Sequence, residues 1–238
     1  MSGSDHFLDE SAQGVPGWNM RFVAETGSTN ADLLAEVELA TPDRTVLRTD
    51  HQTAGRGRLD RTWEAPPGSN LLMSVLFRDV PDDANELTRR VGLAAVAAVS
   101  NVAGVAAQLK WPNDVLVGGR KLAGILAQRA VSGPVVVGIG LNVGWAPPDA
   151  VSLGAEFRPH DIAVALLAAY DALPSDIDAL YRSQLGTLGQ RVRVQRTDST
   201  LEGRALDVER DGRLVVLDDC GVSHRIDVGD VVHLRPAE

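Results

Sequence analysis

The chain has 238 residues, and its 44% hydrophobic and 23% charged content is typical of a soluble globular protein with one large domain or a medium and a small one. A net charge of −9 disfavours a general nucleic-acid binder, and no apolar run is long enough to span a bilayer. The single cysteine, Cys220, excludes an internal disulfide, and the polar N-terminus has no signal-peptide pattern, so we expect a cytoplasmic protein.

The first predicted elements are a tail and two strands. The polar segment up to about Pro16 predicts a loosely attached tail. Apolar and polar side chains alternate over 20–25, and a β-branched run occupies 45–50, so each segment is predicted to be a strand.

Between these strands lie Ser28, Thr29 and Asn30, directly before a helical pattern over 31–36. All three are residue types that cap helix N-termini, so a helix is expected to begin near Ser28. Capping alone is one interpretation of these side chains, and ligand binding is the other.

The next segment, 52–63, alternates glycine with arginine and ends in Trp63. Glycines let a backbone approach a ligand closely, and the planar guanidinium groups of Arg56, Arg58 and Arg61 suit carboxylates and phosphates. Trp63 adds a flat face that could stack on a base. The segment indicates a flexible anion-binding loop, although a solvated basic turn has the same local features.

The middle of the chain predicts a β-meander between helices. The run 108–117 passes through a Pro-Asn-Asp turn, and Gly118-Gly119 turns the chain into 121–127. Lys110, just before Trp-Pro-Asn-Asp, would be costly to bury without an anionic or carbonyl partner, and the alternative is a lysine that snorkels to the surface. The other predicted elements are buried strands at 70–78 and 135–143 and helices at 86–102, 162–172 and 177–188.

From Gln190 onward the pattern changes to short alternating segments separated by turn residues, which predicts a small barrel. The predicted strands are 191–195, 201–206, 213–217, 224–228 and 231–234. We therefore expect a tail over 1–19, a catalytic domain over 20–187 and a C-terminal domain over 188–238.

Several common sites are excluded by spacing. The chain has no phosphate-binding loop of the Gly-x-x-x-x-Gly-Lys-Ser/Thr type, and its two Gly-x-Gly pairs lack the third glycine of a dinucleotide fingerprint. The histidines have no partner at metal-ligand spacing and are expected to be structural: His6, His51, His160, His224 and His233. No serine or cysteine lies in a nucleophile elbow, so in an enzyme the nucleophile would come from the substrate.

Five motifs in order resemble the biotin protein ligases, and the match extends over about 21–234. They are Gly-Ser-Thr-Asn at 27–30, Gln-Thr-Ala-Gly-Arg-Gly-Arg at 52–58 with Arg61 and Trp63, Lys-Trp-Pro-Asn-Asp at 110–114, Lys-Leu-Ala-Gly-Ile-Leu at 121–126 and Gly-Ile-Gly-Leu-Asn at 138–142. The resemblance implies an α+β fold, with a class II aminoacyl-tRNA synthetase-like catalytic domain of mixed sheet and helices and a C-terminal SH3-like β-barrel.

The resemblance also implies a two-step reaction. Biotin and Mg-ATP form biotinyl-5′-AMP and pyrophosphate, and a lysine of a biotin carboxyl carrier domain, from acetyl-CoA carboxylase or a related carboxylase, then takes the biotinyl group. Only about twenty residues precede the catalytic pattern, so no helix-turn-helix domain and no repressor activity are expected. We expect no nucleic-acid or membrane partner, and a monomer or weak homodimer.

The matched positions imply a role for each residue. Catalysis is assigned to Arg56, Arg58 and Lys110, with Lys110 reaching the biotin carboxyl or the acyl-phosphate oxygens. Biotin binding is assigned to Ser28, Thr29, Asn30, Gln52, Arg56, Gly57, Arg58 and Lys110. Nucleotide binding is assigned to Arg61, Trp63, Lys121 and Asn142. Asp114 is a candidate to orient the acceptor lysine. No metal ligand is fixed by the sequence, and Mg²⁺ is expected with ATP.

Three alternatives remain. A lipoate–protein ligase shares the fold and the adenylate logic, a nucleic-acid-binding module could use the loop and the small barrel, and a biotin sensor could have lost its chemistry. The loop at 52–63 is expected to order over the adenylate, because a glycine-rich segment can close over an anion.

Overall fold

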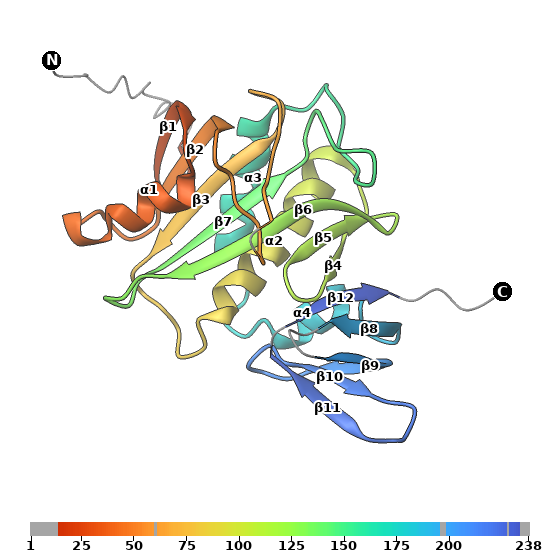
Figure 1. The fold of residues 1–238 in the computed structure, drawn as a ribbon. Helices are drawn as coiled ribbons and strands as arrows, with labels where there is room; N and C mark the ends of the chain where they lie inside the picture. The colour runs from red at the N-terminus through yellow and green to blue at the C-terminus, as the bar shows by residue number, and fades with distance from the viewer. Residues whose placement is uncertain (1–13, 60, 196–198, 228, 234–238) are drawn as a thin grey trace, which may run out of the picture.

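The fold is described from a computed structural model, which places residues 14–59, 61–195, 199–227 and 229–233 (Figure 1). In this part of the chain, seven strands form a mixed sheet in the order β1-β2-β3-β7-β6-β5-β4. Only the β1–β2 pair is parallel. The strands are β1 (Asn19–Thr26), β2 (Thr45–Gln52), β3 (Leu71–Phe77), β4 (Gln108–Lys110), β5 (Asp114–Val117), β6 (Arg120–Arg129) and β7 (Val135–Leu141).

Helices cover both faces of this sheet (Figure 1). One face packs against α2 (Asn85–Ala103) and α3 (Pro159–Asp171), and the other packs against α1 (Thr29–Ala35), which a 3₁₀ turn follows at Val37–Leu39. Strand β3 shows how residues are divided between the faces, because successive side chains of a strand point to opposite sides. Met73 and Val75 lie in the larger core with α2 and α3, whereas Leu76 lies in a smaller cluster with Leu33 of α1.

The described C-terminal residues form a second, antiparallel sheet in the order β11-β10-β9-β8-β12. Its strands are β8 (Arg191–Gln195), β9 (Thr200–Val208), β10 (Leu214–Leu217), β11 (Ser223–Ile226) and β12 (Asp230–His233). Among the described strands, β11 and β12 are opposite edges and are not paired with each other, so this sheet is open where a closed barrel was expected.

The elements expected from the sequence lie at their predicted places, with one helix shorter than expected. The helix predicted over 177–188 is α4 (Asp178–Gln184). It ends early because Leu185 is extended and forms a parallel bridge with Leu109 of β4. The predicted tail lies mostly outside the described residues. None of the helices in the described segments is long and apolar enough to cross a membrane.

Candidate functional site

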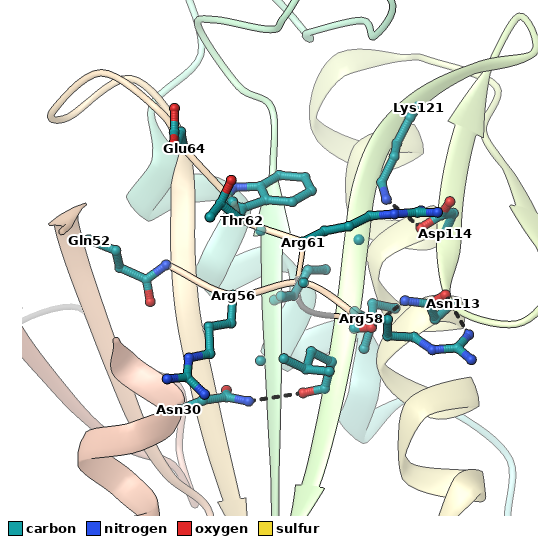
Figure 2. Close-up of a pocket in the computed structure, with 18 of the residues that line it drawn as sticks. Asn30, Gln52, Arg56, Arg58, Arg61, Thr62, Glu64, Asn113, Asp114 and Lys121 are labelled. Carbon is teal, nitrogen blue, oxygen red and sulfur yellow. Dashed lines mark hydrogen bonds and ion pairs between the residues drawn. The ribbon is translucent and has the colours of Figure 1, made fainter. Parts of the chain in front are cut away.

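A pocket of about 250 Å³ opens on the α1 face of the mixed sheet (Figure 2). The floor of the pocket is sheet backbone without side chains at three positions, because β6 and β7 carry glycine where a side chain would point to this face. These residues are Gly124, Gly138 and Gly140. A Cβ at 138 would lie 2.2 Å from Asn30 Oδ1. A Cβ at 140 would lie 2.3 Å from Trp63 Cε2. These glycines therefore let two side chains of the pocket lie directly on the sheet.

One end of the pocket is a buried polar network around the start of α1. The N-cap residue Ser28 has extended backbone and makes no side-chain capping bond, so capping does not account for its hydroxyl. The Thr29 amide donates to Gln52 Oε1 at 2.9 Å, and Asn30 Nδ2 donates to Gln128 Oε1 at 2.8 Å. This end has the donors and acceptors for a small, uncharged polar ring.

The loop expected to bind anions folds back over the pocket as a small hairpin. Arg56 forms an isolated bridge with Thr62, the Trp63 amide donates to the carbonyl of Gly55 at 3.0 Å, and the Gly57 amide donates to that of Arg61 at 2.6 Å. Figure 2 shows the side chains of Arg56 and Arg58 below this loop, in the pocket that both residues line. The loop thus provides both the cover of the pocket and part of its positive charge.

The other end of the pocket is cationic. Arg58 donates to Asn113 Oδ1 at 3.2 Å, and burial lowers its pKa from the ordinary value, opposed by the carboxylates of Asp230 and Asp114. Lys121 Nζ lies 2.7 Å from Asp114 Oδ1 and 5.6 Å from the centroid of the Trp63 ring. An arginine stays charged at neutral pH even when half-buried, so this end presents positive charge to a ligand.

The C-terminal sheet also reaches the site. Asp230, the first residue of β12, accepts a hydrogen bond from Arg61 at 2.5 Å and raises the pKa of that guanidinium. Gly229 and Asp230 line the pocket together with the loop. Arg61, assigned to a nucleotide, is therefore held by a carboxylate from the other sheet, through an exposed pair of small energetic value.

The structure brings most of the residues singled out in the sequence to this pocket, but it does not bring Lys110. Among the described residues that line the pocket are Ser28, Thr29, Asn30, Gln52, Arg56, Gly57, Arg58, Arg61, Trp63, Asp114, Lys121 and Asn142. Lys110 ends the edge strand β4, one strand farther out than Asp114, with which it pairs. Its charge acts on His233 of β12, whose pKa is lowered by burial and by this ammonium.

Asn142 is at the pocket wall but is 2% exposed, and its side chain is held by the protein. Its Nδ2 donates to the carbonyl of Val151 at 3.1 Å, and its Oδ1 accepts from Asn70 at 3.3 Å. In this arrangement the Asn142 side chain links the end of β7 to the backbone of Val151 by a hydrogen bond. A contact with a base would require one of these bonds to be exchanged.

Sequence reasoning missed two pocket residues, Ser74 and Asp230, and it assigned no role to Gly124 within its motif. Ser74 could have been found as the one polar residue in an apolar strand. Asp230 had no local signal, because its position beside the loop depends on how the two sheets pack.

The described residues contain no cluster of three or more His, Cys, Asp or Glu side chains that could hold a metal ion. A divalent cation that arrives with a nucleotide is held mainly by phosphate oxygens and water, so it needs few protein ligands.

Comparison with known proteins supports the family expected from the sequence. Residues 23–144 match the model of the biotin/lipoate A/B protein ligase family, and residues 187–234 match the biotin protein ligase C-terminal domain. The chain is 43% identical to a biotin–[acetyl-CoA-carboxylase] ligase of Mycobacterium tuberculosis, over 92% of this chain and 91% of that protein. It is 30% identical to a bifunctional ligase/repressor of Bacillus subtilis, over 76% of this chain and 64% of that one.

Solved structures agree on the fold. A biotin protein ligase from Aquifex aeolicus, in complex with biotin and ATP, has a TM-score of 0.78 at 24% identity, over 91% of this chain and 99% of that one. A biotin protein ligase from Leishmania major, in complex with biotinyl-5-AMP, has a TM-score of 0.66 at 23% identity, over 90% and 100%.

Proposed function

The chain belongs to the biotin/lipoate A/B protein ligase family, and we propose that it is a biotin–[biotin carboxyl carrier protein] ligase. It would activate biotin with ATP to biotinyl-5′-AMP and transfer the biotinyl group to a lysine of a carrier domain. The observation that carries this proposal is one pocket with a hydrogen-bonding end, where Arg56 lies beside Asn30, a second end with Arg58 and Lys121, and an arginine–glycine loop over both.

The cationic end suits the first half-reaction. A carboxylate must attack an α-phosphate, and two like unit charges about 4 Å apart repel by about 4 kcal/mol at an effective dielectric of 20. Arg58 and Lys121 lie at the same end of the pocket and would offset that repulsion. Cations fixed in place before the reaction stabilise charge that develops on phosphorus without having to reorganise. Mg²⁺ bound with ATP would supply further charge neutralisation.

The polar end suits the ring of biotin. Thr29, Asn30 and Gln52 present hydrogen-bonding groups to a ring that carries N–H and C=O groups, and Ser28 and Arg56 lie beside them. The flat face of Trp63 and the guanidinium of Arg61 remain our candidates for nucleotide contacts. Loop closure would keep water from the adenylate, which is a reactive mixed anhydride.

Lys121, rather than Lys110, is our choice for the ammonium that acts on the reacting oxygens. Its Nζ is next to Asp114 and within the pocket, whereas Lys110 ends the edge strand β4 and does not line the pocket. Asp114 would then interact with a different lysine in each half-reaction. It holds Lys121 first, and in the second half-reaction it would orient the lysine of the carrier domain.

The finer architecture belongs to the same proposal. We infer a catalytic domain over 20–187 related to class II aminoacyl-tRNA synthetases and a C-terminal domain over 188–238 related to SH3 domains. We also infer a cytoplasmic enzyme, monomeric or weakly dimeric, whose partner is the carrier domain of acetyl-CoA carboxylase or a related carboxylase and which does not act on DNA.

The direct test is incubation of the protein with ATP, Mg²⁺, biotin and a biotin carboxyl carrier domain, read by the mass of the carrier. A gain of one biotinyl group, absent when the carrier lysine is replaced by arginine, is the expected result. Competition between biotin and lipoate in ATP–pyrophosphate exchange separates the two branches of the family. Exchange that depends on lipoate and ignores biotin would contradict the proposal.

Replacing Gly140 with alanine is expected to raise the KM for ATP about tenfold, because the Trp63 ring would lose its place on the sheet. The new Cβ would lie 2.3 Å from Cε2 and 2.6 Å from Nε1 of that ring, too close for either to remain. Steady-state pyrophosphate exchange measures the effect. The matched control is Gly27→Ala, where a Cβ meets nothing within 4 Å. An unchanged KM for ATP in Gly140→Ala would show that the Trp63 position is unimportant.

A further inference from the structure

Ser74 is a buried hydroxyl at the polar end of the pocket to which the proposed roles assign nothing. It is 1% exposed and is the polar residue of the apolar strand β3, on the face that carries α1. Its Oγ lies 2.6 Å from Asn30 Oδ1 and 2.6 Å from Thr29 Oγ1. Both neighbours are proposed contacts of the biotin ring. What Ser74 does for them depends on which oxygen carries each hydrogen.

The orientation of the Asn30 amide determines which atom accepts the hydrogen of the Ser74 hydroxyl. Its Nδ2 donates to the carbonyl of Leu126 at 3.1 Å and to Gln128 Oε1 at 2.8 Å, and both of those atoms only accept. The Oδ1 atom must therefore be the one that faces Ser74. An amide oxygen cannot donate, so the single hydrogen of the Ser74 hydroxyl goes to Asn30.

The position of the Thr29 hydroxyl hydrogen follows from that of the Ser74 hydrogen. Ser74 has no hydrogen left for Thr29, so at 2.6 Å the Thr29 hydroxyl must donate to Ser74. Gln52 Oε1 is the more distant acceptor for this hydroxyl, at 3.1 Å, and it also accepts from the Thr29 amide at 2.9 Å, so the 2.6 Å contact with Ser74 takes the hydrogen. The hydroxyl of Thr29 can then only accept from a ligand. Gln52 Nε2, at the other end of its amide, is left as a donor.

We propose that Ser74 is a positioning residue that fixes the direction of these hydrogen bonds and thereby selects a cyclic urea. Thr29 offers an acceptor to an N–H group and Gln52 Nε2 offers a donor to a carbonyl, which is the pattern of adjacent groups in a ureido ring. The dithiolane ring of lipoate has neither group. The inference rests on the proposed function and adds the residue that sets ring specificity within this ligase family.

The test is Ser74→Ala in biotin-dependent ATP–pyrophosphate exchange. The KM for biotin is expected to rise about five- to tenfold, as for loss of one hydrogen bond, with kcat and the KM for ATP nearly unchanged. In a Thr29→Val background, Ser74→Ala should add less than about twofold, because residues that act through one another are not additive. Two carbamate analogues of biotin, each with a different ureido N–H replaced by oxygen, give a further readout. In the wild type, one of them should bind more weakly than biotin because it lacks the N–H that Thr29 accepts. In Ser74→Ala the difference in affinity between that analogue and biotin should be smaller.

The matched control is Thr45→Val, which removes a buried hydroxyl that donates to the Pro42 carbonyl at 2.8 Å, at the opposite end of β2 from Gln52. It should leave the KM for biotin unchanged, and thermal unfolding of each variant measures any general loss of stability. The proposal is overturned by an unchanged KM in Ser74→Ala, by a fall in kcat alone, or by an equal effect in the Thr29→Val background. Failure of the proposed function itself would appear differently, as wild-type exchange that does not depend on biotin.

Discussion

Replacing Lys121 with alanine is expected to reduce the rate of adenylate formation about 100- to 1,000-fold, as for removal of one pre-oriented group that stabilises transition-state charge. The side chain of Lys121 lies over Gly124, and a Cβ at position 124 would be 3.1 Å from Lys121 Nζ. The ammonium points toward Asp114 at the wall of the pocket (Figure 2). Its ammonium therefore reaches the space where carboxylate and phosphate would meet. Single-turnover formation of biotinyl-5′-AMP measures the loss.

Lys110→Ala is the matched control for this prediction, since it removes the same charge from the edge strand β4 of the same sheet. Screening between exposed charges and the separation of Lys110 from the pocket should keep its effect within about threefold. Lys121 lines the pocket and pairs with Asp114, whereas Lys110 does not line the pocket. Comparable losses in both would contradict the assignment to Lys121, and a large loss in Lys110→Ala alone would restore the role first inferred from the sequence.

The two lysines show which properties of the site are local in the sequence and which depend on tertiary structure. The alternating pattern and the glycine turns predict the meander of β4, β5 and β6 because strand periodicity is a local property. Which lysine of that meander faces a ligand is not local. It depends on the strand order, which makes β4 an edge, and on the packing of β12 against that edge.

The same division applies to the rest of the site. The Gly-Arg-Gly-Arg segment and the Ser-Thr-Asn segment are visible as motifs, and both line the pocket. Ser74 is different, because a single serine in a strand of seven buried residues has no meaning until Thr29 and Asn30 are placed against it. The contact between Arg61 and Asp230 joins residues 169 positions apart, and no short-range pattern predicts it. The roles of Ser74 and Asp230 in the site therefore depend on tertiary contacts, which the motifs do not specify.

Replacing Arg58 with alanine is expected to slow adenylate formation about 10- to 100-fold and to let the intermediate escape before transfer. Arg58 is anchored on Asn113 at the cationic end of the pocket, with the carboxylates of Asp114 and Asp230 near enough to raise its pKa against the effect of burial. Without it, this end has two carboxylates and one fewer cation, so an anionic adenylate is held less well. The measurement is the ratio of AMP released to biotinyl groups transferred, which should rise above one.

Two further variants separate charge from shape in this prediction. Arg58→Lys keeps a positive charge but lacks the planar fork, so it should recover part of the adenylation rate while still releasing intermediate. Arg129→Ala removes an exposed arginine whose Nε donates to the carbonyl of Gly133 at 3.0 Å; neither residue lines the pocket, so this variant should behave as wild type. If Arg58→Ala formed adenylate normally and transferred all of it, the loop would act as a cover without an electrostatic role. Partial recovery by lysine would instead show that both the charge and the guanidinium geometry of Arg58 retain the intermediate.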